Sequence, residues 1–511
     1  MAKKTKTNQK AMNIDCAIDL GTENVVVAGK HPVFNTVTCV PMLDGGYDFP
    51  AAVYMESENH CAIGRVAKDN SFLEKDKVAT HFKGKLGTSE MIDVNYHSFS
   101  PEQLTALVLK EAVISAEQEL GKTVRNVILT VPAGFSTHAR AALIHAANMT
   151  GVNVVALVDE PIAAAISYLK SKEAADKVKG KILILDMGAG TTDFFVFDYQ
   201  DQKITPIMKD GIVNQGGNDY TEALTSRIKE KTNWKVSGDK QPRQEEQILK
   251  NKAEEIKQHL SKLKCDQTVV TQGGRPAVVR VTRDEFEKCT VLLQNELEKK
   301  MNEILDKLRN LGIDGIDVVV LTGGASHMPQ VKRLARKIFP ETTKIEEHDH
   351  DCAVVKGAVL YSQSPEKYSI IGKAYGMRVL TPAGEPKVNN IILASDICPV
   401  SRKRIYKTIK DNQERVTLKL YESHAVKPYM NESDGTFLED IVLLLPPGLK
   451  NGCEIEVEFQ LDKSGILSVN AKEKKSGRSV TASFQSEGVV NYKPVEKQKK
   501  EIVTFLKSME K

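Results

Sequence analysis

The chain has 511 residues, 41% of them hydrophobic and 27% charged, which fits a globular protein of about three or four domains. Its 71 basic and 67 acidic residues leave a net charge of only +4, and aromatic residues are 6%, which argues against a dedicated nucleic-acid binder. We expect no membrane span and no secretory signal, because no apolar run reaches the roughly 20 residues that cross a bilayer and none follows the basic start. The eight cysteines form no CxxC pair and predict reduced thiols in a cytoplasmic protein.

The first two segments differ sharply in composition. Residues 1–12 are polar and lysine-rich, which predicts a disordered basic tail. Residues 13–361 alternate buried apolar strands with amphipathic helices, which is the organisation of an α/β domain. The clearest strands are 127–131, 182–185 and 318–321, and the clearest helices are 101–120, 244–263 and 284–308.

The pattern changes after a short segment at 362–376, which we interpret as a linker. Residues 377–490 contain strands that alternate apolar with polar residues, as half-buried antiparallel strands do. The clearest of these strands are 415–422, 454–461 and 465–473, the last two joined by a turn at 462–465. Residues 491–511 predict one short helix.

A sequence echo links IDLGTEN at 18–24 with LDMGAGTTD at 185–193. Each copy is an apolar strand, an Asp-x-Gly turn and a second strand, so each predicts the tip of a β-hairpin. Glycines in the tips let backbone N–H groups approach phosphate oxygens, and threonines add hydroxyl donors. These residues are Gly21, Gly188, Gly190, Thr22, Thr191 and Thr192.

Asp19 and Asp186 precede these glycines and would repel a bare triphosphate. A hydrated Mg²⁺ between the carboxylates and the phosphates removes this objection, because magnesium keeps several waters and takes few carboxylates. Two such tips predict two lobes that clamp one nucleotide. A single tip would equally fit an ordinary tight turn, and the second copy together with a third glycine loop disfavours that alternative.

Two glycine pairs extend the pattern. Gly323 and Gly324 lie where a buried strand runs into a helix that has Pro329 in its first turn, and they would let an adenine or ribose lie on the backbone. Gly216 and Gly217 would close over the phosphates. Either pair alone fits an ordinary strand–helix turn. HDHD at 348–351 contains metal-ligand types, but no further His or Cys ligand lies close in sequence, which favours a solvated loop.

These loops, in this order, resemble the actin-like ATPase superfamily. Within it, the stretch RNVILTVPAGFSTHARAALIHAANMTGVNVVALVDEPIAAAISYL at 125–169 resembles the heat shock protein 70 family, and so does IEVEFQLDKSGILSVNAKEKKSG in the β part. The resemblance covers roughly 13–488. It implies a two-lobed, actin-like (ribonuclease H-like) α/β ATPase domain followed by an antiparallel β-sandwich that binds substrate.

The resemblance also implies roles for single residues. Asp19 and Asp186 would hold Mg²⁺ through water, and Lys83 would lie beside the γ-phosphate and orient the attacking water. Glu160, Thr191 and Asp193 would help to position water, phosphate or a monovalent cation such as K⁺. Pro132 and Arg140 match the switch proline and the relay arginine of the family. The other implied nucleotide contacts are Gly21, Thr22, Glu23, Asn24, Gly188, Ala189, Gly190, Thr192, Gly216, Gly217, Glu254, Lys257, Ser261, Gly323, Gly324 and Ala325. Of these, Glu254, Lys257 and Ser261 share one helix face by their spacing alone.

The chain also departs from the family pattern. Glu23 stands where a Thr is usual, Ala325 and His327 replace a Ser and an Arg, and Ala156 replaces an Arg that helps to dock J-domain partners. The chain between Lys83 and residue 98 is short, and the acidic–leucine linker is not recognisable at 368–376. About 20 residues follow the sandwich, so we expect neither the helical lid nor the acidic C-terminal tetrapeptide.

The sequence thus predicts an ATP-dependent chaperone that binds and releases extended hydrophobic polypeptide segments, with ATP or ADP and Mg²⁺ as ligands. A J-domain co-chaperone and a nucleotide exchange factor are the implied partners. The alternative is a nucleotide-binding co-chaperone or scaffold that hydrolyses ATP weakly or not at all and acts through a partner chaperone. The surviving residues around Lys83 favour the first, whereas Glu23 and the altered linker favour the second.

Overall fold

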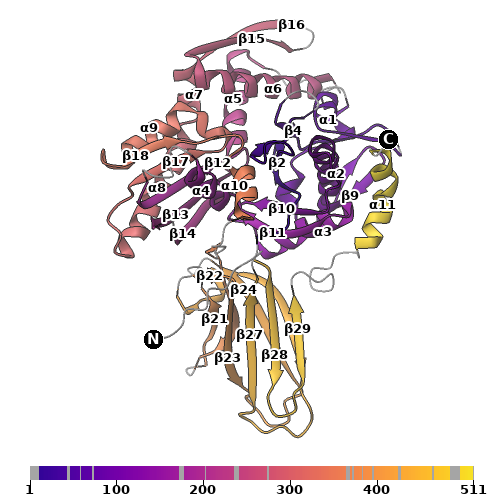
Figure 1. Ribbon diagram of the computed structural model, residues 1–511, viewed down its shortest axis with the longest axis vertical. Coiled ribbons are helices and arrows are strands. Elements are labelled where there is room, and N and C mark those ends of the chain that lie inside the picture. The colour runs from indigo at the N-terminus through magenta and orange to yellow at the C-terminus, as the bar shows by residue number, and fades with distance from the viewer. Residues whose placement is uncertain are drawn as a thin grey trace.

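The computed structural model describes residues 11–42, 46–57, 59–71, 74–171, 178–201, 203–213, 215–234, 241–272, 275–363, 369–370, 373–381, 384–393, 396–423, 427–462, 465–483 and 495–509. These residues form two α/β halves and a β-sandwich that extends away from them (Figure 1). No helix among the described residues is both long and apolar enough to cross a membrane.

The two halves are built on sheets of the same strand order. The first half has the order β11-β10-β1-β2-β3, with β4 also paired to β2, and the second half has β14-β13-β12-β17-β18. In each, a hairpin supplies antiparallel strands and two later strands add in parallel. The strands are β1 (Cys16–Leu20), β2 (Asn24–Lys30), β3 (Val37–Cys39), β4 (Asp48–Pro50), β10 (Asn126–Val131), β11 (Asn153–Asp159), β12 (Gly180–Met187), β13 (Thr191–Gln200), β14 (Lys203–Val213), β17 (Val318–Thr322) and β18 (Lys344–Glu347).

Helices cover both sheets and fill the space between them. The helices α4 (Glu160–Lys170) and α10 (Ala353–Tyr361) contribute to an apolar core that contains residues of both sheets. The first half also carries α1 (Arg65–Asn70), the 3₁₀ helices η1 (Lys75–Lys77) and η2 (Phe82–Lys85), α2 (Pro101–Leu120), α3 (Thr137–Thr150), and the short strands β5 (Val53–Met55), β6 (Cys61–Ile63), β7 (Val78–Ala79), β8 (Ile92–Val94) and β9 (His97–Phe99). The second half carries α5 (Gly217–Lys231), α6 (Gln241–Lys262), α7 (Arg283–Cys289), α8 (Val291–Asn310), η3 (Gly324–His327), α9 (Pro329–Ile338), and the hairpin β15 (Cys265–Gln272) and β16 (Arg275–Thr282).

Helix bounds follow local capping chemistry. The predicted helix 101–120 is α2, because Ser100 and Gln103 form a reciprocal capping box, Pro101 opens the first turn and Gly121 ends the helix at φ 62°. The prediction of one helix over 284–308 is wrong, since the structure has α7 and α8 with Thr290 between them. The Thr290 hydroxyl donates to the carbonyl of Phe286 at 2.9 Å, and its φ of −106° interrupts the helix.

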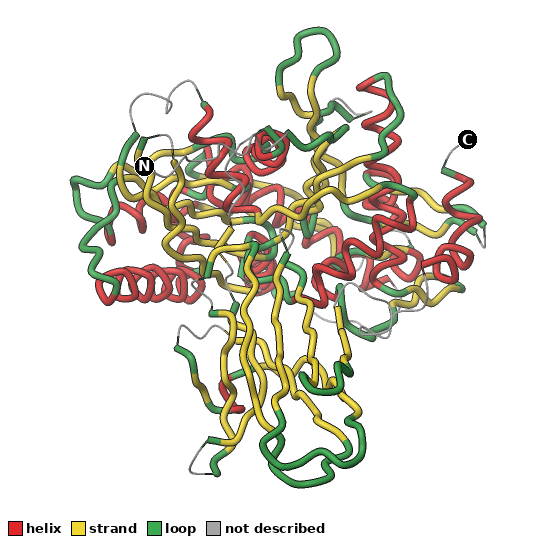
Figure 2. Tube along the Cα trace, turned by 60° about the horizontal axis from the view of Figure 1, so that its bottom comes forward, coloured by secondary structure: helices red, strands yellow, loops and turns green. Residues whose placement is uncertain are grey.

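The C-terminal part is a sandwich of two antiparallel sheets. Their orders are β25-β21-β20-β24-β26 and β23-β27-β28-β29, and Figure 2 shows these strands running away from the α/β halves. The two-stranded pair β19 (Ser369–Ile370) and β22 (Ile397–Cys398) lies at the junction, where β19 also neighbours β14. The sandwich strands are β20 (Ala374–Leu380), β21 (Pro386–Ile392), β23 (Val400–Lys407), β24 (Arg415–Ser423), β25 (Tyr429–Met430), β26 (Thr436–Leu444), β27 (Glu454–Leu461), β28 (Leu467–Glu473) and β29 (Ser479–Ser483), with a 3₁₀ helix η4 (Glu432–Asp434).

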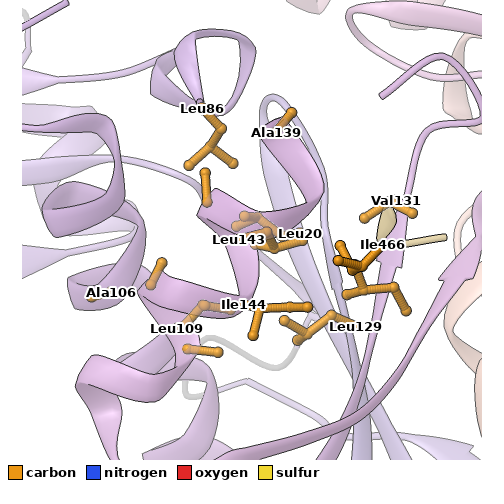
Figure 3. Close-up of a cluster of buried hydrophobic side chains, with 14 of the residues drawn as sticks. Leu20, Leu86, Ala106, Leu109, Leu129, Val131, Ala139, Leu143, Ile144 and Ile466 are labelled. Carbon is orange, nitrogen blue, oxygen red and sulfur yellow. The ribbon is translucent and has the colours of Figure 1, made fainter. Parts of the chain in front are cut away.

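The sandwich packs against the first half. One apolar core continues from the first half into the sandwich, and Figure 3 shows Ile466 of the sandwich beside Val131 and Leu129 of β10. The buried hydroxyls of Thr137 and Tyr375 are hydrogen-bonded at 2.9 Å across the same boundary. The sandwich is therefore joined to the first half by both apolar and polar contacts.

The predicted C-terminal helix is α11 (Val495–Ser508), and it packs on α2 and α3 of the first half (Figure 1). Ile502 and Phe505 are buried, and the Phe505 ring meets His97 and Phe99 edge-on, with ring centroids 5.2 and 5.8 Å apart. The Gln103 amide donates to Glu501 at 2.9 Å. The end of the chain thus returns to the first half instead of covering the sandwich.

Candidate functional site

Both echo motifs form hairpin tips, which confirms the sequence-based prediction. In the first, β1 and β2 pair antiparallel with Leu20 opposite Val25, so residues 21–23 form the turn. In the second, β12 and β13 pair with Met187 opposite Thr192, so residues 188–190 form the turn. Asn24 begins β2, and its carbonyl accepts the N–H of Gly21 at 2.8 Å across the first tip.

The two tips meet. A Cβ added to Gly190 of the second tip would lie 2.8 Å from Oγ1 of Thr22 in the first tip, closer than real Cβ contacts allow. A side chain at position 190 would therefore require Thr22 or the turn to move. The two turns therefore come together at Gly190 and Thr22.

The start of α5 braces the second tip. The N–H groups of Gly217 and Asn218 donate to the carbonyls of Gly188 and Ala189 at 2.9 and 2.8 Å. A Cβ on Gly216 would lie 2.5 Å from the carbonyl oxygen of Ala189, so this glycine permits the close approach. The Gly216–Gly217 pair thus holds the turn in place by direct contact.

The third loop lies against the same tip. Gly323 follows β17, which is the parallel neighbour of β12, and it adopts φ +81°. A Cβ there would lie 2.4 Å from Oδ1 of Asp186. Gly324 and Ala325 follow in η3, and Ala325 is buried beside Gly217. The sheet order therefore brings three of the predicted loops to one place.

Lys83 stands among four carboxyl groups. Its Nζ donates to Oε1 of Glu160 at 3.0 Å and lies 5.5 Å from the centre of the Phe135 ring, and the side chain is only 5% exposed. The carboxyls of Asp19, Asp186 and Asp193 complete the group, as their shared electrostatic interaction with Lys83 shows. Two partners fix carboxyl orientation: the Thr130 hydroxyl donates to Asp19, and the N–H of Ala133 donates to Asp193 at 3.0 Å.

The pKa of each of these carboxyl groups is raised. Burial is the largest cause for all four, and it raises the pKa of Glu160 to about 8 and that of Asp193 to about 6. Burial also raises the pKa of Asp19, and burial together with repulsion from Glu160, Asp193 and Asp19 places that of Asp186 well above its ordinary value. The positive charge of Lys83 lowers the pKa of all four carboxyls, but this effect is smaller than that of burial. The cluster therefore favours either bound protons or an added cation.

The donor set fits a hydrated magnesium ion. Asp19 and Asp186 would hold it together with water and phosphate oxygens, and the negative charge in excess of Lys83 would be compensated by it. Among the described residues, no three His, Cys, Asp or Glu side chains come together as a metal-binding group. A pair of carboxylates rather than a cage is what a site for phosphate-bound Mg²⁺ needs.

The remaining predicted residues lie around this centre. The Thr191 side chain is hydrogen-bonded to Asp193, and the buried Thr192 hydroxyl donates to the carbonyl of Gln215 at 2.8 Å, so it is already partnered. On α6, the buried Lys257 donates from Nζ to the carbonyl of Gly217 and to the Thr221 hydroxyl, both at 2.8 Å. Burial lowers the pKa of Lys257.

Of the other two predicted α6 residues, Glu254 contacts the first half, whereas Ser261 bonds within its own helix. Glu254 pairs with Lys68 of the first half at 3.6 Å, and the Ser261 hydroxyl lies 3.4 Å from the carbonyl of Lys257. Glu23 is bonded to His81 and Asn218. Glu254 and Glu23 thus both connect the two halves.

Sequence reasoning missed the carboxylate next to Glu160. Asp159 is buried and pairs with Arg140 at 2.6 Å and with Lys209. Burial opposes its ionisation, but Arg140 and Lys209 outweigh burial and lower its pKa. The other side of Arg140 lies against the sandwich, because a Cβ on Gly465 would lie 3.4 Å from its Nη1. The signal that could have identified Asp159 is that it directly precedes Glu160 in the sequence.

The HDHD segment is a loop, as its sequence predicts, with Asp349 and Asp351 exposed, but its two histidines are half-buried. His348 is within 3.0 Å of the Ser167 hydroxyl, and Nδ1 of His350 is within 2.7 Å of the Ser326 hydroxyl. The His350 ring stacks on His327 with centroids 3.8 Å apart. The histidines anchor the segment to α4 and to the third loop, a contact that only the tertiary fold creates.

Comparison with known proteins gives consistent matches. A family model described as Hsp70 protein matches residues 61–510. The chain is 28% identical over 480 residues to the chaperone protein DnaK of Thermotoga neapolitana, covering 90% of this chain and 78% of that protein. It is 27% identical over 481 residues to the chaperone protein DnaK of Thermosipho melanesiensis, covering 91% and 79% of the two chains.

Proposed function

This chain belongs to the Hsp70 protein family, a family of chaperones, and on that premise we propose that it hydrolyses ATP to drive binding and release of extended apolar polypeptide segments. The observation that carries the proposal is the meeting of Gly190 with Thr22 beside Lys83 and its carboxyl cluster. We propose that the two α/β halves are the lobes of an actin-like ATPase domain, with one nucleotide clamped between the tips.

The phosphates would be held mainly by backbone. The N–H groups of Gly21 and Gly188 are bonded within their turns, so the other N–H groups of the two turns would contact phosphate, and Thr22 would add a hydroxyl. Gly323 and Gly324 would take the adenosine, since the third loop lies against Asp186 and Ala325 touches the start of α5. Magnesium, when bound, would neutralise the phosphate oxygens. We propose K⁺ as a further ligand near Glu160 and Asp193.

Lys83 and the carboxyls would carry the hydrolytic step. The Lys83 ammonium, held by Glu160 and the Phe135 ring, is placed to stabilise the charge that develops on the transferred phosphoryl group. The pKa values of Glu160, about 8, and Asp193, about 6, bracket neutrality. A carboxyl with a pKa of about 6, as at Asp193, is mostly ionised at neutral pH and would accept a proton from the attacking water, whereas Glu160 would keep its own proton until about pH 8.

The sandwich offers a groove for the polypeptide. A cavity of about 950 Å³ in the sandwich is lined by residues that include Leu380, Tyr429 and Met430. Leu380 and Tyr429 are 57% and 58% exposed, so an apolar segment would bury surface that water now covers. Charged residues of both signs line the cavity, and Lys373 pairs with Glu422 at 2.7 Å. An extended chain bound there would use main-chain bonds and side-chain pockets together.

Coupling between ATP and polypeptide would run through Arg140. It joins Asp159, the neighbour of Glu160, to the Gly465 turn of the sandwich. The Thr137–Tyr375 bond and the position of β19 beside β14 support the same route. A J-domain co-chaperone and a nucleotide exchange factor are the proposed partners, and a cytoplasmic location agrees with the buried thiols of Cys16, Cys39 and Cys352.

Single-turnover ATP hydrolysis tests the proposal. We expect Lys83→Ala to lower the rate by about 100-fold, the usual loss when a charge-stabilising donor is removed. Lys85→Ala is the matched control, because Lys85 lies in the same 3₁₀ helix but pairs with Glu90 outside the cluster. Equal rates for wild type and Lys83→Ala would remove Lys83 from the mechanism. A wild type that binds ATP without hydrolysing it would favour a nucleotide-binding scaffold.

A further inference from the structure

A carboxylate occupies the first hairpin tip, directly after the phosphate-facing Thr22, yet it is turned away from open solvent. The Glu23 side chain is 18% exposed. Its Oε1 accepts a hydrogen bond from Nε2 of His81 at 2.5 Å and another from the Asn218 amide at 2.8 Å. One oxygen of the carboxylate, Oε1, therefore accepts two hydrogen bonds from the protein.

These two donors come from different halves of the molecule. His81 belongs to the first half, directly before η2, whereas Asn218 is the second residue of α5 in the second half. The backbone N–H of Asn218 is bonded to the carbonyl of Ala189 in the second tip. One carboxylate oxygen thus links the first tip, the segment before Lys83 and the helix that braces the second tip.

His81 is held in an unusual backbone conformation. Its φ of +59° and ψ of 18° lie in the left-handed region, which costs a non-glycine residue free energy. The bond from Glu23 and a 2.8 Å contact between Nδ1 and the Thr80 hydroxyl compensate for this cost. Because η2 begins at the next residue, the conformation of His81 sets where Lys83 enters the cluster.

The charges around Glu23 keep it ionised. Burial opposes ionisation, but the His81 hydrogen bond, the His81 and Lys68 charges and the Asn218 amide outweigh it and lower the pKa of Glu23 to about 2. A cavity of about 140 Å³ adjoins the carboxylate and is lined from both halves, by Lys68 on one side and by Lys250 and Glu254 on the other.

We propose that Glu23, His81 and Asn218 form a clasp across the nucleotide cleft, in which Glu23 is a positioning residue that slows nucleotide release and seats Lys83. The inference rests on the proposed nucleotide site for the identity of the ligand. The clasp joins the first tip to α5, whose Asn218 N–H is bonded to Ala189 of the second tip, so the two halves cannot separate there while the clasp is intact. Breaking it frees α5 from the first tip and relaxes the His81 backbone.

Release of N-methylanthraniloyl-ADP, followed by stopped-flow fluorescence, tests the clasp. We expect Glu23→Ala and Asn218→Ala each to accelerate release by about tenfold, the value of a hydrogen bond to a charged group. The double variant should release nucleotide no faster than Glu23→Ala alone, because Glu23→Ala already removes the bond that Asn218→Ala removes. Asn218→Asp would place a second carboxylate beside that of Glu23. Because the two would repel each other, this variant should release nucleotide faster than Asn218→Ala.

The simpler role for Glu23, repulsion of phosphate, predicts the opposite sign. Removing a repelling carboxylate would slow release, so slower or unchanged release from Glu23→Ala overturns the clasp. Glu74→Gln is the matched control, because Glu74 accepts bonds from Tyr54 and Lys77 within the first half, and its release rate should stay within twofold of wild type. Additive effects in the double variant also count against the clasp.

A second readout needs no nucleotide. In the nucleotide-free protein, amide hydrogen exchange of residues 20–25 and 217–220 should be faster in Glu23→Ala than in wild type. Wild type that binds no N-methylanthraniloyl-ADP would refute the proposed nucleotide site, and the exchange measurement would then still decide the clasp. Unchanged exchange at both segments would refute the clasp itself.

Discussion

Four carboxyl groups around one lysine, two of them buried and two half-buried, set the chemistry at the scale of single residues. Charges removed from water are costly unless they are paired, and here the protein supplies Lys83 and little else. The sequence predicted which residues belong to the site: Asp19, Lys83, Glu160, Asp186 and Asp193. It could not indicate their pKa values, because those depend on burial and on distances that only the fold sets.

The raised pKa of Glu160 predicts how stability changes with pH. Its carboxyl binds a proton more readily when folded, at about pH 8, than when unfolded, near 4.5, so the stabilisation is full below the unfolded value and is lost as pH rises through the folded value. In nucleotide-free protein, the urea concentration at the unfolding midpoint should decrease as the pH rises from about 4.5 to about 8. This fall should be smaller in Glu160→Gln, measured by urea titration at each pH. An equal fall in both proteins would refute the assignment.

The roles of several residues at the site could not be predicted from the sequence. Thr130 orients Asp19 from a neighbouring strand, and Lys209 neutralises Asp159 from β14. Nothing in their local sequence distinguishes them from ordinary strand residues. Their roles arise from the strand order, in which β10 is the neighbour of β1 and β14 is the edge strand beside β13.

At the scale of elements, the hairpins and the longest helices follow from local sequence. The two Asp-x-Gly turns, the capping box of α2 and the strand β27, predicted at 454–461 and found at Glu454–Leu461, were all readable because each depends on neighbouring residues. The break at Thr290 was not, since a buried threonine within an apolar helical pattern carries no stop signal. The contact between the tips was equally unreadable, because it joins two separate sheets.

Gly190 and Gly188 offer a matched test of that contact. A Cβ at position 190 would lie 2.8 Å from Thr22 Oγ1, whereas the nearest atom to a Cβ at position 188 is 3.7 Å away. We expect Gly190→Ala to force the tips apart and to weaken Mg–ADP binding at least tenfold by calorimetry, and Gly188→Ala to stay within about threefold of wild type. Equal affinities for the two variants would show that the tips do not need to touch.

At the scale of the whole molecule, the repeated strand order and the docked sandwich are the main findings. The echo between residues 18–24 and 185–193 predicted two similar tips, and the structure extends the similarity to whole sheets. The sandwich and α11 both rest on the first half, through Ile466 and through Phe505. Neither contact follows from periodicity, because amphipathic patterns show that a face is buried but not which surface covers it.

Arg140 should carry the coupling between the two parts. We expect Arg140→Ala to reduce the effect of ATP on the release rate of a fluorescent peptide by at least about fivefold, the lower range of allosteric coupling. Arg140→Lys keeps a positive charge beside Asp159, so it separates loss of coupling from loss of folding. Lys122→Ala, which removes a half-exposed ion pair with Asp15, is the surface control. A full ATP effect in folded Arg140→Ala would remove this residue from the route.

The most direct test of the account is a crystal structure with Mg–ADP bound. The diphosphate should lie between the turns at 21–23 and 188–190, with Asp19 and Asp186 turned toward the hydrated metal and Lys83 within reach of the position of the third phosphate. Nucleotide bound elsewhere on the chain, or turns too far apart to touch one diphosphate, would contradict the account.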